Sequence, residues 1–447
     1  MKLAQVFVLL TGLGMGYVGI PIAVQAETTS AIAQLTLAQT FPVQPSTNSA
    51  EQIYRSGISQ LNAGEYEQAT ESFTRAISLS ANYAPAYLYR GFALAAQGNH
   101  VAAVQDYDRA IRLANDNPQA YFYRGISYVS LNQPQSAMTD FDRMIALEPE
   151  EAEGYIHRGA LKASRSDQPG ALADLNRAIE LDDEKAEAYL NRGSVLFGLG
   201  RIQEAIADLN QAIDLDPESP YAYYNRGFIY SSQGGLRTAV ADFTQAIALK
   251  PDYAEAFRNR GLMQAKLGDR RAAISDLNRA LALNPNDAES FKVRGDVRFM
   301  AGDRVGAIAD YDQAISLRPG YADAFRSRAD ARIAAGNPAG AEEDYSQFLA
   351  IQPAAAENVT ATAAVLSDRG ELRSQMGNHQ GAMADYTQAI RLNAQDAEAF
   401  MNRGKLYASQ GNTAAARADF QQAANLFLQQ GEAEGYRQVL QQIRGLR

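Results

Sequence analysis

Three asparagines, Asn191, Asn225 and Asn259, recur at intervals of 34 residues, and Asn402 occupies the equivalent place in a later copy of the same pattern. A carboxamide carries both donor and acceptor groups, so it can pair with both partners of a peptide backbone. A row of such side chains predicts a surface that holds an extended polypeptide regardless of its sequence. The alternative is that these asparagines are ordinary solvated side chains.

Large apolar residues stand near the asparagines in the repeating pattern. If they face a shared groove, they form an apolar patch too large for an inert surface, which indicates a partner with hydrophobic anchors. The alternative is that packing between repeating units buries part of this set. Besides the four asparagines, the candidate peptide-binding residues are Tyr89, Phe122, Tyr123, Phe197, Tyr224 and Phe228.

The composition argues against catalysis, metal binding and nucleic-acid binding. There is no Cys, which excludes disulfides, thiolate metal sites and cysteine nucleophiles. The three histidines are far apart in sequence, and neither a phosphate-binding glycine loop nor an H-E-x-x-H motif occurs. With 51 acidic against 41 basic residues, the net charge is -10, whereas a nucleic-acid site requires a basic patch. We expect a non-enzymatic protein with no catalytic residue, cofactor or metal.

The first 26 residues have the pattern of a secretory signal peptide. Lys2 precedes an uncharged apolar stretch, and Ala26 ends a segment suitable for signal peptidase. We expect cleavage after Ala26 and an extracytoplasmic location, which is periplasmic, lumenal or secreted, without stable membrane insertion. An uncleaved membrane anchor is the alternative. Residues 27–49 are polar and contain prolines, which predicts a flexible linker.

The asparagines belong to a 34-residue repeat that covers most of the chain. Eight glycines, from Gly57 to Gly295, are each 34 residues apart; Ala329 takes the next place, and Gly370 and Gly404 restore the spacing after seven extra residues. Eleven units therefore run over residues 50–353 and 363–430. The insertion at 354–362 forms a joint that either lengthens a helix by two turns or bends the array.

Each unit is predicted to form two amphipathic helices. With the glycine counted as repeat position 8, positions 4, 8 and 11 share one helical face, and positions 20, 24, 27 and 28 share another. Small residues at positions 8 and 20 let the two helices approach closely, and glycine at position 15 ends the first helix. Within residues 431–447, Tyr436, Val439, Leu440 and Ile443 predict a final helix that covers the end of the array.

Arginine at repeat position 7 and aspartate at position 23 change together. Ten units contain both, whereas the first unit has Ser56 and Ser72. A pair between neighbouring units would leave Arg90 facing Ser72, so we expect an ion pair within each unit. We interpret these charges as structural, with a functional ladder as the alternative. Removing one partner costs about 3–5 kcal/mol from a buried pair and about 0–1 kcal/mol from an exposed one.

Units seven to nine have Arg258, Lys292 and Arg326 at position 5. A carboxylate lies three residues before each of them, so we expect local ion pairs on a solvated face. A basic stripe that holds an acidic peptide is the alternative.

The repeat resembles the tetratricopeptide repeat family. That family has an aromatic residue at position 4, Gly at 8, Ala at 20, an aromatic residue at 24, Ala at 27 and Pro at 32, and one unit matches throughout, with Tyr223, Gly227, Ala239, Phe243, Ala246 and Pro251. The resemblance implies an all-α, right-handed α-solenoid superhelix of helix-turn-helix units. It also implies a concave groove, lined by positions 2, 5, 6, 9, 12 and 13 of the first helices, that binds extended peptides through asparagine ladders at position 6.

The sequence therefore predicts a protein-interaction scaffold that binds a protein or peptide segment. The alternative is a structural spacer or assembly subunit that contacts its partners through its ends or its convex face. A regulatory subunit of a cell-envelope enzyme is a third hypothesis.

Overall fold

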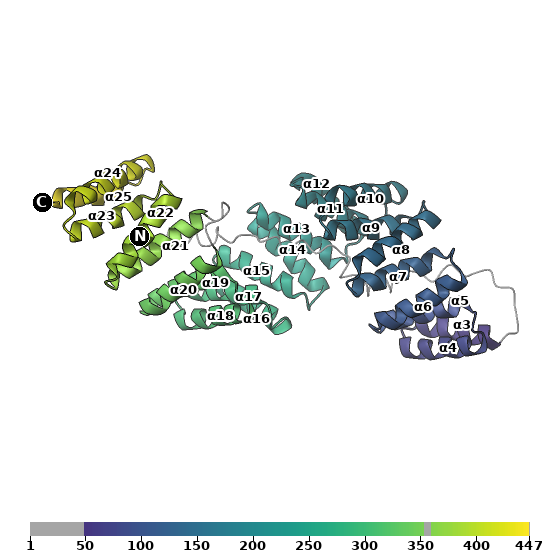
Figure 1. The fold of residues 1–447 in the computed structure, drawn as a ribbon. Helices are drawn as coiled ribbons and strands as arrows, with labels where there is room; N and C mark the ends of the chain where they lie inside the picture. The colour runs from purple at the N-terminus through teal and green to yellow at the C-terminus, as the bar shows by residue number, and fades with distance from the viewer. Residues whose placement is uncertain (1–48, 353–358, 447) are drawn as a thin grey trace. The chain divides into compact units, whose positions relative to one another are not determined.

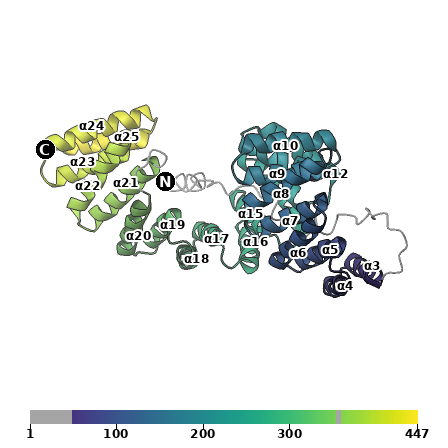
Figure 2. The same ribbon diagram turned by 45° about the vertical axis from the view of Figure 1, so that its right-hand side comes forward.

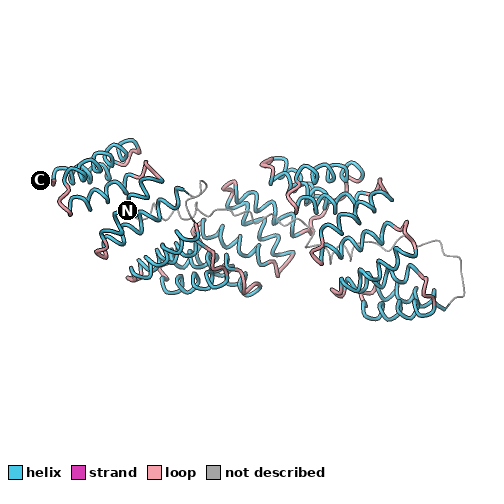
Figure 3. The backbone as a smooth tube through the Cα atoms, viewed as in Figure 1, coloured by secondary structure: helices cyan, strands magenta, loops and turns pink. Residues whose placement is uncertain are grey.

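The computed structural model describes residues 49–352 and 359–446, and within these ranges it contains 23 α-helices and no strand (Figures 1 and 3). The all-α prediction is confirmed. None of these helices is long and apolar enough to cross a membrane. The predicted signal peptide, nearly all of the predicted linker and most of the insertion lie outside the described residues.

The described residues divide into two compact units, the first ending at Pro251 and the second beginning at Asp252. The first unit contains repeats one to six. Its helices are α3 (Ser49–Asn62), α4 (Tyr66–Leu79), α5 (Ala84–Ala96), α6 (His100–Leu113), α7 (Pro118–Ser130), α8 (Pro134–Leu147), α9 (Ala152–Ser164), α10 (Gln168–Leu181), α11 (Ala186–Gly198), α12 (Ile202–Leu215), α13 (Pro220–Ser232) and α14 (Leu236–Leu249).

The second unit contains repeats seven to eleven and the final helix. Its helices are α15 (Ala254–Lys266), α16 (Arg270–Leu283), α17 (Ala288–Met300), α18 (Arg304–Leu317), α19 (Ala322–Ala334), α20 (Pro338–Ile351), α21 (Val359–Gln375), α22 (His379–Leu392), α23 (Ala397–Ser409), α24 (Thr413–Gln429) and α25 (Ala433–Gly445).

Each repeat is a pair of antiparallel helices. Within each unit, the second helix also packs against the first helix of the following repeat, as α4 does against α5 and α18 against α19 (Figure 2). The close approach depends on glycine at position 8, because a Cβ on Gly295 would lie 2.6 Å from Cε1 of Tyr311 at position 24. Repeat nine accepts Ala329 at this position, in one buried cluster with Tyr345.

The turn between the two helices places repeat position 15 in the left-handed region. Nine repeats have glycine there, for example Gly200 with φ 75° and Gly268 with φ 91°. Repeats three and four have Asn132 (φ 55°) and Ser166 (φ 66°) instead. A side chain costs free energy in this conformation and glycine does not, so glycine terminates the first helix as predicted.

Replacing Ser166 with glycine is expected to raise the free energy of unfolding by about 1 kcal/mol, because a non-glycine residue in the left-handed region is strained. Urea denaturation measures the change. Ser164→Gly is the matched control, since Ser164 ends the regular helix α9 and glycine there should destabilise by up to about 1 kcal/mol. Changes of the same sign at both positions would contradict the prediction.

Helix α21 has 17 described residues, against 13 in first helices such as α19 and α23. Its described part begins at Val359, directly after residues 353–358, which lie outside the described ranges. The choice between a helix lengthened by two turns and a bent array therefore stays a prediction.

The predicted capping helix is confirmed. Helix α25 packs on α24, with Val439 fully buried in one cluster with Phe427 and with Tyr436 and Ile443 partly buried against it. The last repeat therefore buries its apolar face under α25.

Candidate functional site

The candidate peptide-binding residues all lie on first helices, as expected for positions that line a groove. Helices α5, α7, α11 and α13 of the first unit hold eight of them, whereas Asn259 lies on α15 and Asn402 on α23 of the second unit. Asn259, Asn402, Phe197 and Phe228 are partly exposed. The buried ones are Tyr89, Phe122, Tyr123, Asn191, Tyr224 and Asn225.

Buried candidates contact a neighbouring repeat or the second helix of their own repeat. Nδ2 of Asn225 donates to Oγ of Ser194, 3.0 Å away on α11. The ring of Tyr224 packs on Phe243, with centroids 5.6 Å apart. Packing between helices thus uses part of the predicted set, and recognition of a peptide by these ten residues stays a prediction.

Partly exposed candidates also meet across one repeat joint. The rings of Phe197 on α11 and Phe228 on α13 form an edge-to-face pair with centroids 6.0 Å apart. In the second unit, Nζ of Lys405 donates to Oδ1 of Asn402 at 2.9 Å. Phe197, Phe228 and Asn402 keep part of their surface exposed beside these contacts.

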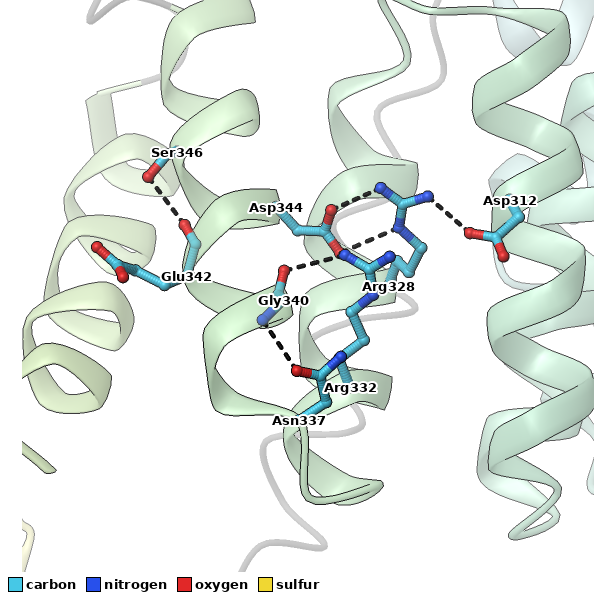
Figure 4. A network of polar contacts seen from close by, with 8 residues as sticks. All are labelled: Asp312, Arg328, Arg332, Asn337, Gly340, Glu342, Asp344 and Ser346. Carbon is cyan, nitrogen blue, oxygen red and sulfur yellow. Dashed lines mark hydrogen bonds and ion pairs between the residues drawn. The ribbon is translucent and has the colours of Figure 1, made fainter. Parts of the chain in front are cut away.

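The predicted ion pair within each repeat is confirmed ten times. In repeat nine, Nε and Nη2 of Arg328 donate to the two oxygens of Asp344 at 3.0 and 2.6 Å (Figure 4). The aspartate side chains are at most 10% exposed, so the buried form of the prediction holds. The other pairs are Arg90–Asp106, Arg124–Asp140, Arg158–Asp174, Arg192–Asp208, Arg226–Asp242, Arg260–Asp276, Arg294–Asp310, Arg369–Asp385 and Arg403–Asp419.

The arginine at position 7 is held in a fixed orientation. Its Cζ lies 5.3–5.6 Å from the centroid of the aromatic ring at position 4 in nine repeats, as for Arg192 and Tyr189. The hydrogen bonds to Asp208 raise the pKa of Arg192, although burial opposes this shift. The guanidinium therefore stays charged, and its cation–π contact with the ring at position 4 helps to hold it in place.

A second basic residue, at repeat position 11, was missed by the sequence reasoning. Nη1 of Arg332 donates to Oδ2 of Asp344 at 2.8 Å and to the carbonyl of Gly340 at 3.0 Å (Figure 4). Arg298, Arg373 and Lys162 contact the aspartate of their own repeats in the same way. The signal was a basic residue four places after the arginine, which puts both on one helical face.

The expected local ion pairs on a solvated face are wrong for Arg258 and Lys292. Arg258 and Lys292 are 8% and 3% exposed, so they do not lie on a solvated face. Nη1 of Arg258 reaches Asp287 at 2.9 Å, and Nζ of Lys292 contacts Asp296 at 2.8 Å on the next turn. The packing of consecutive repeats brings closer carboxylates to Arg258 than its own helix does, and Lys292 pairs with the residue four places later.

Acidic residues at position 9 accept hydrogen bonds from buried tyrosines at position 24. The hydroxyl of Tyr311 donates to Asp296 at 2.9 Å and that of Tyr345 donates to Asp330 at 2.5 Å. Burial raises the pKa of both tyrosines, so they remain donors. The co-occurrence of an acid at position 9 with tyrosine at position 24 in these repeats was a readable signal.

Asp368 on α21 lies among like charges. Loss of surrounding water and the carboxylate of Asp330 raise the pKa of Asp368 to about 7, and Arg326 opposes the shift. The side chain still reaches solvent. The folded chain therefore binds this proton more tightly than the unfolded chain, whose aspartates titrate near pH 4.

Asp368 should consequently destabilise the fold as the pH rises from about 4 to about 7. Asp368→Asn is expected to raise the melting temperature at pH 8 and to leave it unchanged at pH 4.5. Glu343→Gln is the matched control, since Glu343 is an exposed carboxylate on α20. A melting temperature shifted equally by Asp368→Asn at the two pH values would refute the assignment.

The histidines do not assemble into a site. His157 is 5% exposed and packs between Phe122 and Phe141, with ring centroids 5.0 and 5.9 Å away. Over residues 49–352 and 359–446, no group of three or more histidines and carboxylates is arranged to hold a metal ion.

A cleft of about 630 Å³ lies along α22. Met383, Thr387, Arg391 and Leu392 line it, and Gln410 contributes from the end of α23. None of the predicted peptide-binding residues borders this cleft.

Three family models for tetratricopeptide repeats match the chain. A TPR repeat model matches residues 161–200, 193–234, 229–268 and 370–411. Two tetratricopeptide repeat models match residues 54–118, 264–322 and 294–356, and residues 397–429. No curated protein sequence matches.

Solved structures with similar folds include YrrB, described as a TPR protein with an unusual peptide-binding site. It is 27% identical, with 40% of this chain and 92% of YrrB covered and a TM-score of 0.35. MamA is 25% identical, with 39% and 96% covered and a TM-score of 0.36. A tetratricopeptide repeat protein from Parabacteroides merdae is 19% identical, with 56% and 98% covered and a TM-score of 0.47.

The repeat models together match more than half of the chain, and the helices pair as the repeat requires. The chain belongs to the tetratricopeptide repeat family.

Proposed function

We propose that this protein is a non-catalytic interaction scaffold that binds an extended peptide or protein segment along its first helices. Members of its family are generally protein-interaction scaffolds. The observation that supports the proposal is a difference between two sets of positions within each repeat. Positions 7, 8, 20, 23 and 24 join the helices to one another, whereas the first-helix positions 5, 6 and 9 differ from repeat to repeat. Several of these side chains are buried and pair with other residues, but Phe228, Asn259 and Asn402 are partly exposed, and varied side chains that partners can reach support a role in recognition.

The chemistry of these positions differs between the units. In the first unit they are mostly aromatic, aliphatic or amide side chains, with Phe228 at position 9 partly exposed, as is Phe197 at position 12. In the second unit they include Asn259, Asn402 and the exposed Asp368. An extended partner that follows both units would therefore need an apolar part and a polar or charged part.

The test is a crosslinked pull-down from an extract of the source cells with the chain from Glu27 as bait. A second bait carries Asn259→Ala and Asn402→Ala, which change partly exposed amides and leave the buried Asn191 and Asn225 in place. A control bait carries Gln313→Ala and Gln347→Ala on exposed parts of α18 and α20. A partner lost only with the asparagine variant supports the proposal, provided that its melting temperature matches the other two.

Equal recovery on all three baits would favour the structural spacer or assembly subunit instead. Crosslinks from the partner to second helices or to the ends of the array would then identify the contact surface. A regulatory subunit would copurify with an enzyme whose activity changes when the chain is removed.

Export of the chain is part of the same proposal and rests on the sequence of residues 1–26. Intact mass measurement of the protein from its own cells tests it. A chain that begins at Glu27 supports cleavage and an extracytoplasmic location. A full-length chain in the membrane fraction would support the anchor, and a full-length chain in the cytosol would refute export.

A further inference from the structure

The arginine at position 7 also joins each repeat to the preceding one. Nη1 of Arg328 donates to Oδ1 of Asp312, 2.6 Å away on the second helix of repeat eight (Figure 4). The same nitrogen makes the equivalent contact at all nine joints within the two units, and the acceptor always occupies repeat position 25. Even across the insertion, Nη1 of Arg369 donates to Ser346 at 2.9 Å.

The chemical type of this acceptor differs between joints. It is a carboxylate at 2.6–2.7 Å in Asp108, Asp142 and Asp312. It is an amide oxygen at 2.7–2.9 Å in Asn176, Asn210 and Asn278. It is a hydroxyl at 2.9–3.3 Å in Thr74, Ser346 and Thr387.

The geometry separates the contact within a repeat from the contact between repeats. Nε and Nη2 are bound to the buried aspartate of the same repeat, so the guanidinium moves with its own repeat. A rotation of repeat nine away from repeat eight would break the bond from Arg328 to Asp312 and leave the pair with Asp344 intact. The polar contact at position 25 therefore depends on the angle between two consecutive repeats.

We propose that repeat position 25 sets how readily each joint opens. A hydrogen bond between two ionised groups is stronger than one to a neutral acceptor, so the contact resists opening most with aspartate, less with asparagine and least with serine or threonine. Other contacts also resist the opening of a joint, such as the ion pair of Arg373 with Glu342 at 2.7 Å beside the Ser346 joint. The type of acceptor at position 25 thus determines which joints between repeats resist opening and which open more readily.

The test exchanges the acceptors of two adjacent joints in the full chain. Asp312→Asn weakens the joint before α19, and Asn278→Asp strengthens the joint before α17, with little change of side-chain shape. Hydrogen exchange of the backbone amides of these two helices is measured at low and high salt. We expect Asp312→Asn to speed exchange in α19 about two- to fivefold at low salt, and Asn278→Asp to slow exchange in α17 by a similar factor.

Salt distinguishes the proposed electrostatic role from a change in packing. At about 1 M salt, the contact of Arg328 with the exposed carboxylate of Asp312 is partly screened, so both effects should shrink. Glu343→Gln removes the same charge from an exposed position on α20 that makes no ion pair within the described part of the chain, and it should leave both helices unchanged. Unchanged exchange in both variants, or changes that persist at high salt, would overturn the proposal.

Discussion

Replacing Asp344 with alanine is expected to lower the free energy of unfolding by about 3–5 kcal/mol. Asp344 is fully buried and accepts hydrogen bonds from Arg328 and Arg332, whose side chains are only 14% and 20% exposed. Its removal leaves two partly buried guanidiniums without their shared carboxylate. Since each arginine keeps some access to water and Arg328 keeps Asp312, we expect a loss near the lower end of this range.

Asp312→Ala is the matched control for this experiment. Asp312 contacts the same arginine, but its side chain is 48% exposed, so its loss should cost about 0–1 kcal/mol. Because repeat arrays can unfold in parts, urea denaturation should be combined with hydrogen exchange in α19 and α20. Equal losses for the two variants would show that burial of Asp344 does not determine the strength of the pair.

The fold could be predicted from the sequence because the same 34-residue pattern recurs in eleven units. The period located the helices, and glycine at position 15 located their turns. In one unit both residues are replaced together, by Ser56 and Ser72, which indicated that the arginine and the aspartate pair within one repeat. The structure replaces that ion pair with a hydrogen bond from Ser72 to Gln60, at 2.7 Å in the same repeat.

The contacts between repeats were not readable in the same way. Position 25 holds aspartate, asparagine, serine or threonine, so its shared role as an acceptor leaves no single residue type to notice. The partner of Arg258 was misassigned because helical spacing describes neighbours on one helix, whereas Asp287 lies at the N-cap of α17, the helix that begins the next repeat. Burial of Asn225 likewise depends on its contact with Ser194 on the preceding first helix, which periodicity does not specify.

The second large effect is expected at the buried pair of Lys292 and Asp296. Nζ of Lys292 lies 2.8 Å from Oδ2 of Asp296, and the two side chains are 4% and 17% exposed. Oδ1 of the same carboxylate accepts the hydroxyl of Tyr311. Asp296→Ala leaves a buried ammonium and a buried hydroxyl without this acceptor, so the free energy of unfolding should fall by about 3–5 kcal/mol.

A double replacement separates the cost of the charge from the cost of the hydroxyl. Asp296→Asn keeps an amide oxygen for Tyr311 but leaves the ammonium of Lys292 unpaired, so it should remain strongly destabilising. Adding Lys292→Met removes that buried charge and fills its space with an apolar chain, and buried ion pairs can often be replaced in this way at little cost. We therefore expect the double variant to unfold within about 1 kcal/mol of the natural chain in urea. A double variant no more stable than Asp296→Asn alone would show that the unpaired ammonium of Lys292 is not the source of the lost stability.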